Sequence, residues 1–185
     1  MSRGKRVLLI ISGGIAAYKS LELVRELQTL DIKVRCILTK AGSQFVTPLS
    51  LQTLTEDTVY QDLFSLTDEN EMGHIELSRD ADLLVIAPAT ANIIAKMRAG
   101  ISDDLATTTL IATDKPILVA PAMNVRMWEH PSTRENIAEI KKRGVHFIGP
   151  ETGDMACGDY GMGRMTEPQS ISKKIISILD DNDNL

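Results

Sequence analysis

The chain has 185 residues, of which 43% are hydrophobic, 24% are charged and 4% are aromatic. This length suits one well-buried core, so we expect a single domain over residues 1–185 with a flexible tail at about 180–185. The formal net charge of −5 leaves no basic surface of the kind that phosphate backbones require, which excludes nucleic acid as a partner.

Hydropathy and cysteine usage both indicate a cytoplasmic protein without a membrane partner. No apolar run approaches the roughly 20 residues that cross a bilayer, and the first run is too early and too short for a secretory signal. Cys36 and Cys157 lie far apart in different surroundings, which favours reduced thiols. The three His and two Cys are too dispersed to form a closely spaced ligand pair, so we expect no metal site.

Expected strands and helices alternate along the chain. Residues 6–11 form an apolar run typical of a strand buried on both faces of a parallel sheet, and residues 16–30 show helical spacing. The next expected strands cover residues 33–38, 83–87, 117–120 and 145–148. The next expected helices cover residues 92–97, 103–112, 132–143 and 169–179. The alternation predicts an α/β fold, a Rossmann-like doubly wound parallel sheet with helices on both faces.

Ligands of such a sheet lie beyond the carboxyl ends of its strands. After the first strand, residues 12–20 resemble a Walker A loop, but Tyr18 stands where a second glycine should precede Lys-Ser, which excludes a P-loop ATPase. Gly13 and Gly14 do not complete the G-x-G-x-x-G dinucleotide fingerprint either. What remains is a turn before a helix N-terminus, either a general phosphate site or only a tight connection.

Small side chains with a few hydrogen-bonding groups follow four of the expected strands. A flat heteroaromatic ring with a phosphate tail needs such residues, because bulky side chains would fill the crevice. Helix capping explains any one of these turns equally well. The candidate cofactor-binding residues are Ser12, Gly13, Gly14, Ile15, Thr39, Ser43, Pro88, Ala89, Thr90, Asn92 and Met123.

Residues 153–165 set Cys157 in a glycine-dense segment with little that could build a core. Its glycines permit positive φ and close approach to a bound molecule, so we interpret the segment as a ligand-covering loop that delivers the thiol. The alternative is a mobile surface loop with an incidental cysteine. The glycines are Gly153, Gly158, Gly161 and Gly163.

Five segments, in this order, resemble motifs of the homo-oligomeric flavin-containing cysteine decarboxylases, and most of all the phosphopantothenoylcysteine decarboxylases of coenzyme A synthesis. They are SGGIAAYK at 12–19, MGHIEL at 72–77, PATAN at 88–92, PAMNVRMW at 121–128, and ACGD at 156–159 with GRM at 163–165. The resemblance runs from about residue 5 to the C-terminal helix. Its most specific parts are residues 121–128 and 156–159.

The resemblance implies FMN as the cofactor and phosphopantothenoylcysteine as the substrate. The substrate thiol is oxidised to a thioaldehyde, carbon dioxide leaves, and the ene-thiol is reduced to 4'-phosphopantetheine. His74 is then the expected base, although without the resemblance we would interpret it as a surface or capping histidine. Cys157 is expected to protonate the ene-thiol carbon.

Further residues are candidates for binding the substrate. Asn124 can hold the carboxylate without a strong charge pairing, or it can cap a helix at residues 125–130. Arg79 is a candidate for anion contact or subunit pairing, with a solvated surface charge as the alternative. Met127 either lines the site or packs in the core. The resemblance adds Ala156, Gly158 and Asp159 to this group.

The family also implies partners. Its members form homotrimers, sometimes grouped into dodecamers, with active sites at subunit interfaces, and His74 could act across one. A phosphopantothenate-cysteine ligase, fused or separate, is the implied protein partner. Three alternatives stay open: a peptidyl-cysteine decarboxylase, a flavin prenyltransferase of related fold, and a non-catalytic flavin-binding regulatory subunit.

Overall fold

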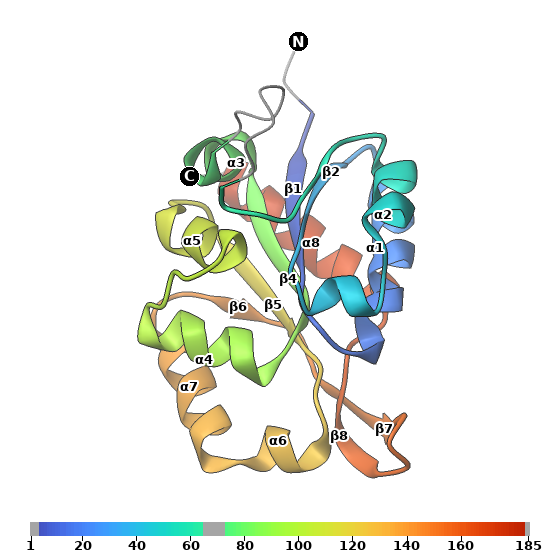
Figure 1. Ribbon diagram of the computed structural model, residues 1–185, viewed down its shortest axis with the longest axis vertical. Helices are drawn as coiled ribbons and strands as arrows, with labels where there is room; N and C mark the ends of the chain where they lie inside the picture. The colour runs from blue at the N-terminus through green and yellow to red at the C-terminus, as the bar shows by residue number, and fades with distance from the viewer. Residues whose placement is uncertain (1–3, 65–72, 184–185) are drawn as a thin grey trace.

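A six-stranded parallel sheet in the order β3-β2-β1-β4-β5-β6 organises the chain and confirms the predicted fold class (Figure 1). The computed structural model describes residues 4–64 and 73–183. The strands are β1 (Arg6–Ile11), β2 (Lys33–Leu38), β3 (Val59–Tyr60), β4 (Leu83–Ala89), β5 (Ile117–Pro121) and β6 (His146–Phe147). A separate antiparallel hairpin consists of β7 (Glu151–Asp154) and β8 (Tyr160–Arg164).

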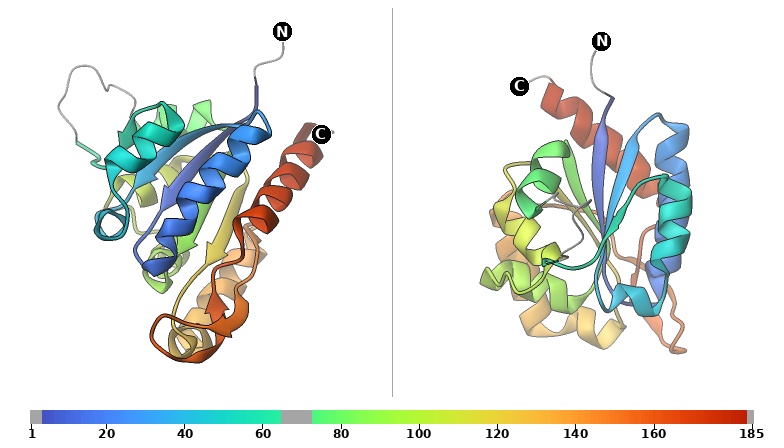
Figure 2. Two further views of the ribbon diagram at one scale, coloured as in Figure 1. Left: turned by 90° about the vertical axis from the view of Figure 1, so that its right-hand side faces the viewer. Right: turned by 45° about the horizontal axis from the view of Figure 1, so that its top comes forward.

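Helices cover both faces of the sheet. On one face α1 and α8 lie side by side, as Figure 2 shows, and α2 adds to the same apolar cluster. On the other face α3, α4, α5 and α7 form a second cluster. The helical segments are η1 (Ile15–Tyr18), α1 (Lys19–Thr29), η2 (Gly42–Gln44), α2 (Pro48–Thr55), α3 (His74–Asp80), α4 (Ala91–Ala99), α5 (Leu105–Ala112), α6 (Val125–Glu129), α7 (Pro131–Lys142) and α8 (Pro168–Asp183).

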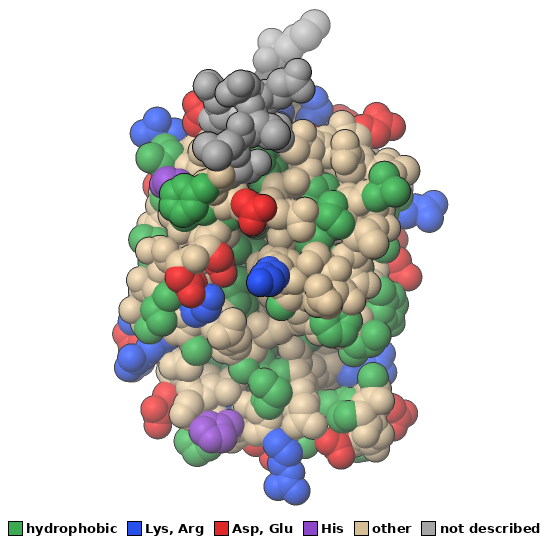
Figure 3. Space-filling model, in the orientation of Figure 1, with side chains coloured by type: hydrophobic (Ala, Val, Ile, Leu, Met, Phe, Trp, Pro, Cys, Tyr) green, Lys and Arg blue, Asp and Glu red, His purple; other side chains and the backbone are tan. Residues whose placement is uncertain are grey.

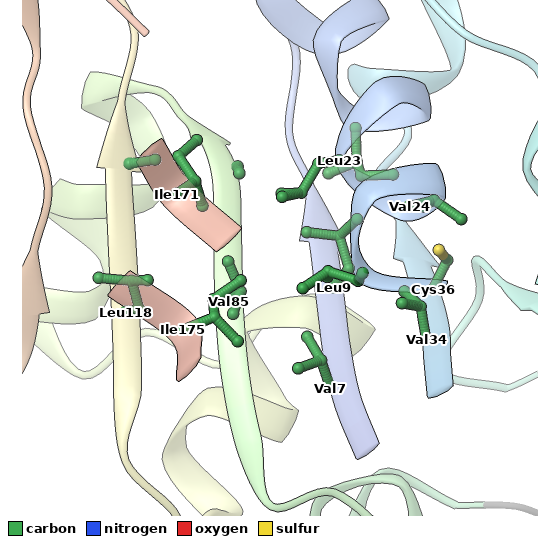
Figure 4. Close-up of a cluster of buried hydrophobic side chains, with 14 of the residues drawn as sticks. Val7, Leu9, Leu23, Val24, Val34, Cys36, Val85, Leu118, Ile171 and Ile175 are labelled. Atoms are coloured by element: carbon green, nitrogen blue, oxygen red, sulfur yellow. The ribbon is translucent and has the colours of Figure 1, made fainter. Parts of the chain in front are cut away.

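Buried strands supply apolar side chains to both clusters, because successive side chains point to opposite faces. Figure 4 shows Leu9, Val85 and Leu118 of three neighbouring strands on the face that Leu23 of α1 and Ile171 of α8 cover. All five side chains are fully buried. Truncating a buried leucine of this kind to alanine costs about 2–5 kcal/mol. The core therefore fixes the sheet, and the sheet fixes the positions of the residues that follow its strands.

The structure adds elements that the apolar pattern did not predict. Helix α2 has only Leu51 fully buried, yet Thr47 caps its first turn and Pro48 occupies a position that favours a helix start. Helix α8 continues to Asp183, where the sequence predicted a flexible tail from about 180, because an established helix extends readily into polar residues. Residues 184 and 185 lie outside the described part of the chain.

The outer surface is mixed in character. Lysine and arginine side chains are scattered among acidic and apolar ones on the face shown in Figure 3. Among the described residues, no helix combines the length and apolarity needed to span a bilayer.

Candidate active site

The chain reverses its direction of winding between β1 and β4, which makes the carboxyl ends of these strands the expected ligand crevice. Ser12, directly after β1, links the two ends. Its Oγ donates to the carbonyl of Pro88 at 2.6 Å and accepts from the N–H of Thr90 at 3.2 Å. The buried Ser12 hydroxyl therefore holds the two strand ends together.

A cavity of about 580 Å³ opens beyond this edge of the sheet. Its walls are residues 14–16, 18 and 19 after β1, residues 122–124 after β5, and residues 154–157 and 163–165 of the hairpin. A space of this size accommodates a small molecule or part of a cofactor. Two of the four strand-end regions expected to bind a ligand, those after β1 and β5, form part of its wall, and the glycine-dense segment forms another part.

That segment is a β-hairpin rather than the loop that the sequence predicted. A Cβ on Gly161 would lie 2.3 Å from Val125, and a Cβ on Gly163 would lie 2.2 Å from the carbonyl oxygen of Met123. The φ angles of these glycines are 156° and 154°, which other residues rarely adopt. Met123 donates from its backbone N–H to the Gly163 carbonyl at 3.0 Å. These two glycines thus permit close approach to the chain itself, where we expected approach to a ligand.

The hairpin brings three predicted side chains together. Asn124 Nδ2 donates to Oδ2 of Asp159 at 2.9 Å and lies 3.7 Å from Sγ of Cys157. The Cys157 thiol lies 3.5 Å from the same Asp159 oxygen. Asn124 also caps α6, because its Oδ1 accepts from the N–H of Arg126 at 2.7 Å. The capping interpretation of Asn124 is therefore confirmed, while its amide nitrogen faces the hairpin tip and leaves substrate binding as a prediction.

A buried cation in the cavity wall was missed by the sequence analysis. Lys19 is 6% exposed, and its Nζ donates to the Met165 carbonyl at 3.2 Å and to Glu167 at 2.7 Å. Arg164 lies 3.1 Å from the same carboxylate oxygen. The hydrogen bond from Lys19, followed by the charges of Lys19 and Arg164, lowers the pKa of Glu167. Its signal in the sequence is the lysine that ends SGGIAAYK, a segment that serves there both as an incomplete Walker A loop and as a family motif, without a role for Lys19 itself.

The remaining cofactor candidates lie at the same edge of the sheet. The Thr39 hydroxyl donates to the Ile11 carbonyl at 3.2 Å, and Ser43 donates to the Lys40 carbonyl at 2.8 Å. Thr90 caps α4. Each of these three hydroxyls thus has a local backbone partner. Of the other strand-end candidates, Pro88 and Ala89 are buried at the end of β4, and Asn92 is exposed in α4.

Two candidates lie elsewhere in the fold. His74 is the first residue of α3, and Arg79 lies in the last turn of the same helix. The buried Leu77 of α3 packs on the face of the sheet opposite to α1. Helix α3 is at the top of Figure 1, whereas α6 and the hairpin are at the bottom. Of the residues that the structure describes, the cavity wall includes neither His74 nor Arg79, nor the half-exposed Met127 of α6. Met72, the first residue of the histidine motif, lies outside the described residues.

Comparisons with known proteins agree with this fold. The chain is 48% identical over 168 residues to the coenzyme A biosynthesis bifunctional protein CoaBC of Vibrio vulnificus (strain YJ016), covering 91% of this chain and 42% of that protein. It is 46% identical over 168 residues to CoaBC of Escherichia coli (strain K12), covering 91% and 41%. The chain thus spans about two fifths of the length of these curated relatives.

Solved structures are similar over nearly the whole chain. A cysteine-to-serine mutant of PPC decarboxylase complexed with pantothenoylaminoethenethiol superposes with a TM-score of 0.83 at 37% identity, covering 96% of this chain and 100% of that one. The FMN binding protein AtHal3 superposes with a TM-score of 0.84 at 39% identity, covering 97% and 98%. The model of the Flavoprotein family matches residues 1–180. The chain therefore belongs to the Flavoprotein family.

Proposed function

We propose that this chain is an FMN-dependent phosphopantothenoylcysteine decarboxylase that forms 4'-phosphopantetheine in coenzyme A biosynthesis. The observation that carries the proposal is the meeting of Asn124, Cys157 and Asp159 at a cavity beside the sheet's switch point. The names of the similar proteins support it, since they include a PPC decarboxylase and coenzyme A biosynthesis proteins.

The residues at the strand ends fit a flavin mononucleotide. Helix η1 begins at Ile15, and its N-cap residue Gly14 provides no side-chain cap, so its first N–H groups are available to a phosphate. A Cβ on Gly14 would meet nothing within 4 Å, which indicates open space beside this turn. Ile15 and Met123 offer apolar surface to a flat ring at the cavity wall. Residues 12–15, 88–90 and Met123 would hold the cofactor.

When bound, FMN supplies a two-electron acceptor and donor, through which the substrate thiol becomes a thioaldehyde before carbon dioxide leaves and the ene-thiol is reduced afterwards. Asn124 holds the substrate carboxylate with neutral N–H donors, which orient it without the ground-state stabilisation that a cation would add. The Cys157 thiol, 3.7 Å from that amide nitrogen, gives its proton to the carbon that has lost the carboxylate.

His74 acts as the base from a neighbouring subunit. Its position on α3, outside the wall of its own cavity, supports this assignment. Exposed apolar side chains on the cavity side of the molecule also support a subunit contact there, since Ile15 is 60% exposed and Tyr18 is 51% exposed. The assembly is a homotrimer or a dodecamer built from such trimers, and Arg79 takes part in anion contact or subunit pairing.

A ligase and a cytoplasmic location complete the proposal. The curated relatives extend beyond the region that this chain matches. Phosphopantothenate-cysteine ligase, as a fused half or a separate protein, is therefore the proposed source of the substrate. Coenzyme A synthesis from soluble intermediates is in keeping with the predicted cytoplasmic location.

The test uses protein reconstituted with FMN and incubated anaerobically with phosphopantothenoylcysteine. We expect carbon dioxide and 4'-phosphopantetheine in equal amounts, with no external reductant consumed. A cysteine-terminated peptide in a parallel reaction should release no carbon dioxide. Decarboxylation of the peptide alone would favour the peptidyl-cysteine alternative, and failure to retain FMN would overturn the proposal.

A further inference from the structure

The hydrogen bonds of Asn124 fix the direction of its side-chain amide. Its Oδ1 accepts from the backbone N–H of Arg126 at 2.7 Å. A flipped amide would turn its NH₂ group toward that N–H, donor against donor, so Nδ2 must face the hairpin tip. Asn124 therefore presents N–H donors to the cavity while its acceptor is committed to α6.

The hairpin tip already engages these donors. Nδ2 lies 2.9 Å from Oδ2 of Asp159 and 3.7 Å from Sγ of Cys157. A substrate carboxylate bound to Asn124 needs the place that the Asp159 carboxylate occupies. Two carboxylates at one amide repel each other at this separation, so the two ligands of Asn124 exclude one another.

Asp159 also contacts the thiol. The Sγ of Cys157 donates to the same Oδ2 at 3.5 Å. Within residues 4–64 and 73–183, no cation lies within ion-pair distance of Asp159. Neutral donors hold a carboxylate less strongly than cations do, and an incoming carboxylate can therefore displace this one.

We propose that Asp159 is a positioning residue whose carboxylate occupies the substrate carboxylate's place on Asn124 and returns there after carbon dioxide has left. The inference rests on the decarboxylase function proposed above. Because the Cys157 thiol is hydrogen-bonded to the Asp159 carboxylate, the return of Asp159 to Asn124 brings this thiol to the carbon that has just lost its carboxylate. Competition for one amide thus places carbon dioxide loss before protonation. This role differs from the direct substrate contact predicted for Asp159 from the sequence.

Binding of two inert ligands tests the competition without catalysis. S-methylated phosphopantothenoylcysteine carries the carboxylate and S-methylated phosphopantetheine lacks it, and neither has a free thiol. Calorimetry would measure the affinity of each for the FMN-loaded wild type, Asp159→Asn and Glu151→Gln. The first variant keeps the size and an acceptor oxygen but removes the charge. The second removes a charge from an exposed residue of β7 that lies outside the cavity wall.

We expect Asp159→Asn to tighten binding of the carboxylate ligand by about tenfold and to change the affinity for the other ligand by less than about twofold. Glu151→Gln should leave both affinities unchanged. Equal effects of Asp159→Asn on the two ligands, or weaker binding of the carboxylate ligand, would overturn the inference. A wild type that retains FMN but binds neither ligand would overturn the proposed function, and this inference with it.

Turnover provides a second readout that a purely structural role would not change in this way. The flavin spectrum and Tm of Asp159→Asn should be unchanged, and its KM for phosphopantothenoylcysteine should be lower. The variant should still catalyse carbon dioxide release, but the ene-thiol should accumulate, because residue 159 no longer brings the Cys157 thiol to the carbon that lost its carboxylate. A raised KM with normal conversion to 4'-phosphopantetheine would contradict the proposal.

Discussion

Cys36 and Cys157 carry the same thiol in opposite surroundings. Cys36 lies in β2 with 0% of its surface exposed, and burial, followed by the charge of Asp57, raises its pKa to about 12. Cys157 lies exposed at the hairpin tip beside Asn124 and Asp159. The sheet buries one thiol among apolar side chains, whereas the elements at its carboxyl edge leave the other exposed in the cavity wall.

Replacing the exposed thiol tests the comparison most severely. We expect Cys157→Ser to retain FMN and to release carbon dioxide, while 4'-phosphopantetheine formation falls by about a hundredfold or more because the proton donor is lost. Mass spectrometry should detect the ene-thiol instead of the product. Cys36→Ser is the matched control and should give the normal product. Normal product from Cys157→Ser would remove the distinction between the two thiols.

Displacing the β7–β8 hairpin from the segment after β5 should separate the Cys157 thiol from Asn124. A Cβ on Gly163 would meet the Met123 carbonyl oxygen at 2.2 Å, so Gly163→Ala should displace β8 from the segment that carries Asn124. We expect product formation to fall by about tenfold, with carbon dioxide release measured alongside. Gly4→Ala, where a Cβ meets nothing within 4 Å, is the control. An active Gly163→Ala enzyme would show that the close approach is not required.

The buried thiol should matter for stability alone. Cys36→Ser places a hydroxyl where the apolar cluster offers little hydrogen bonding, which should lower the free energy of unfolding by about 1–3 kcal/mol. Urea denaturation would measure the loss, and kcat should stay unchanged. A serine variant as stable as the wild type would mean that this part of the core tolerates a polar group.

The smallest expected effect concerns the cavity wall. Because Lys19 lowers the Glu167 pKa from its ordinary 4.5, this carboxylate stabilises the fold at pH values above about 4.5, and the contribution is lost as the pH falls through the lowered pKa. Glu167→Gln should cost about 1 kcal/mol at neutral pH, since the Glu167 side chain is 44% exposed and partly screened.

Unfolding curves of both proteins at several pH values would measure this contribution. The difference between them should shrink in acid. A difference that grows as the pH falls would contradict the assigned sign.

The sequence predicted the elements that burial dictates and missed those that tertiary contacts decide. The apolar run of β1 identified a strand correctly because both of its faces are buried. Nothing local indicates that Gly161 packs on Val125, or that Lys19 is buried against Glu167. The family motif predicted a catalytic role for His74, but the separation of this residue from the hairpin within the chain depends on the packing of α3.

The proposed oxidation of the substrate thiol by FMN can be followed in the visible flavin band when the FMN-loaded protein is mixed anaerobically with phosphopantothenoylcysteine. We expect rapid bleaching of the band as the substrate thiol is oxidised. In the wild type the band should then recover as 4'-phosphopantetheine forms, whereas Cys157→Ser should show bleaching without a matching amount of product. A flavin band that stays unchanged while substrate is present would contradict the proposed oxidation.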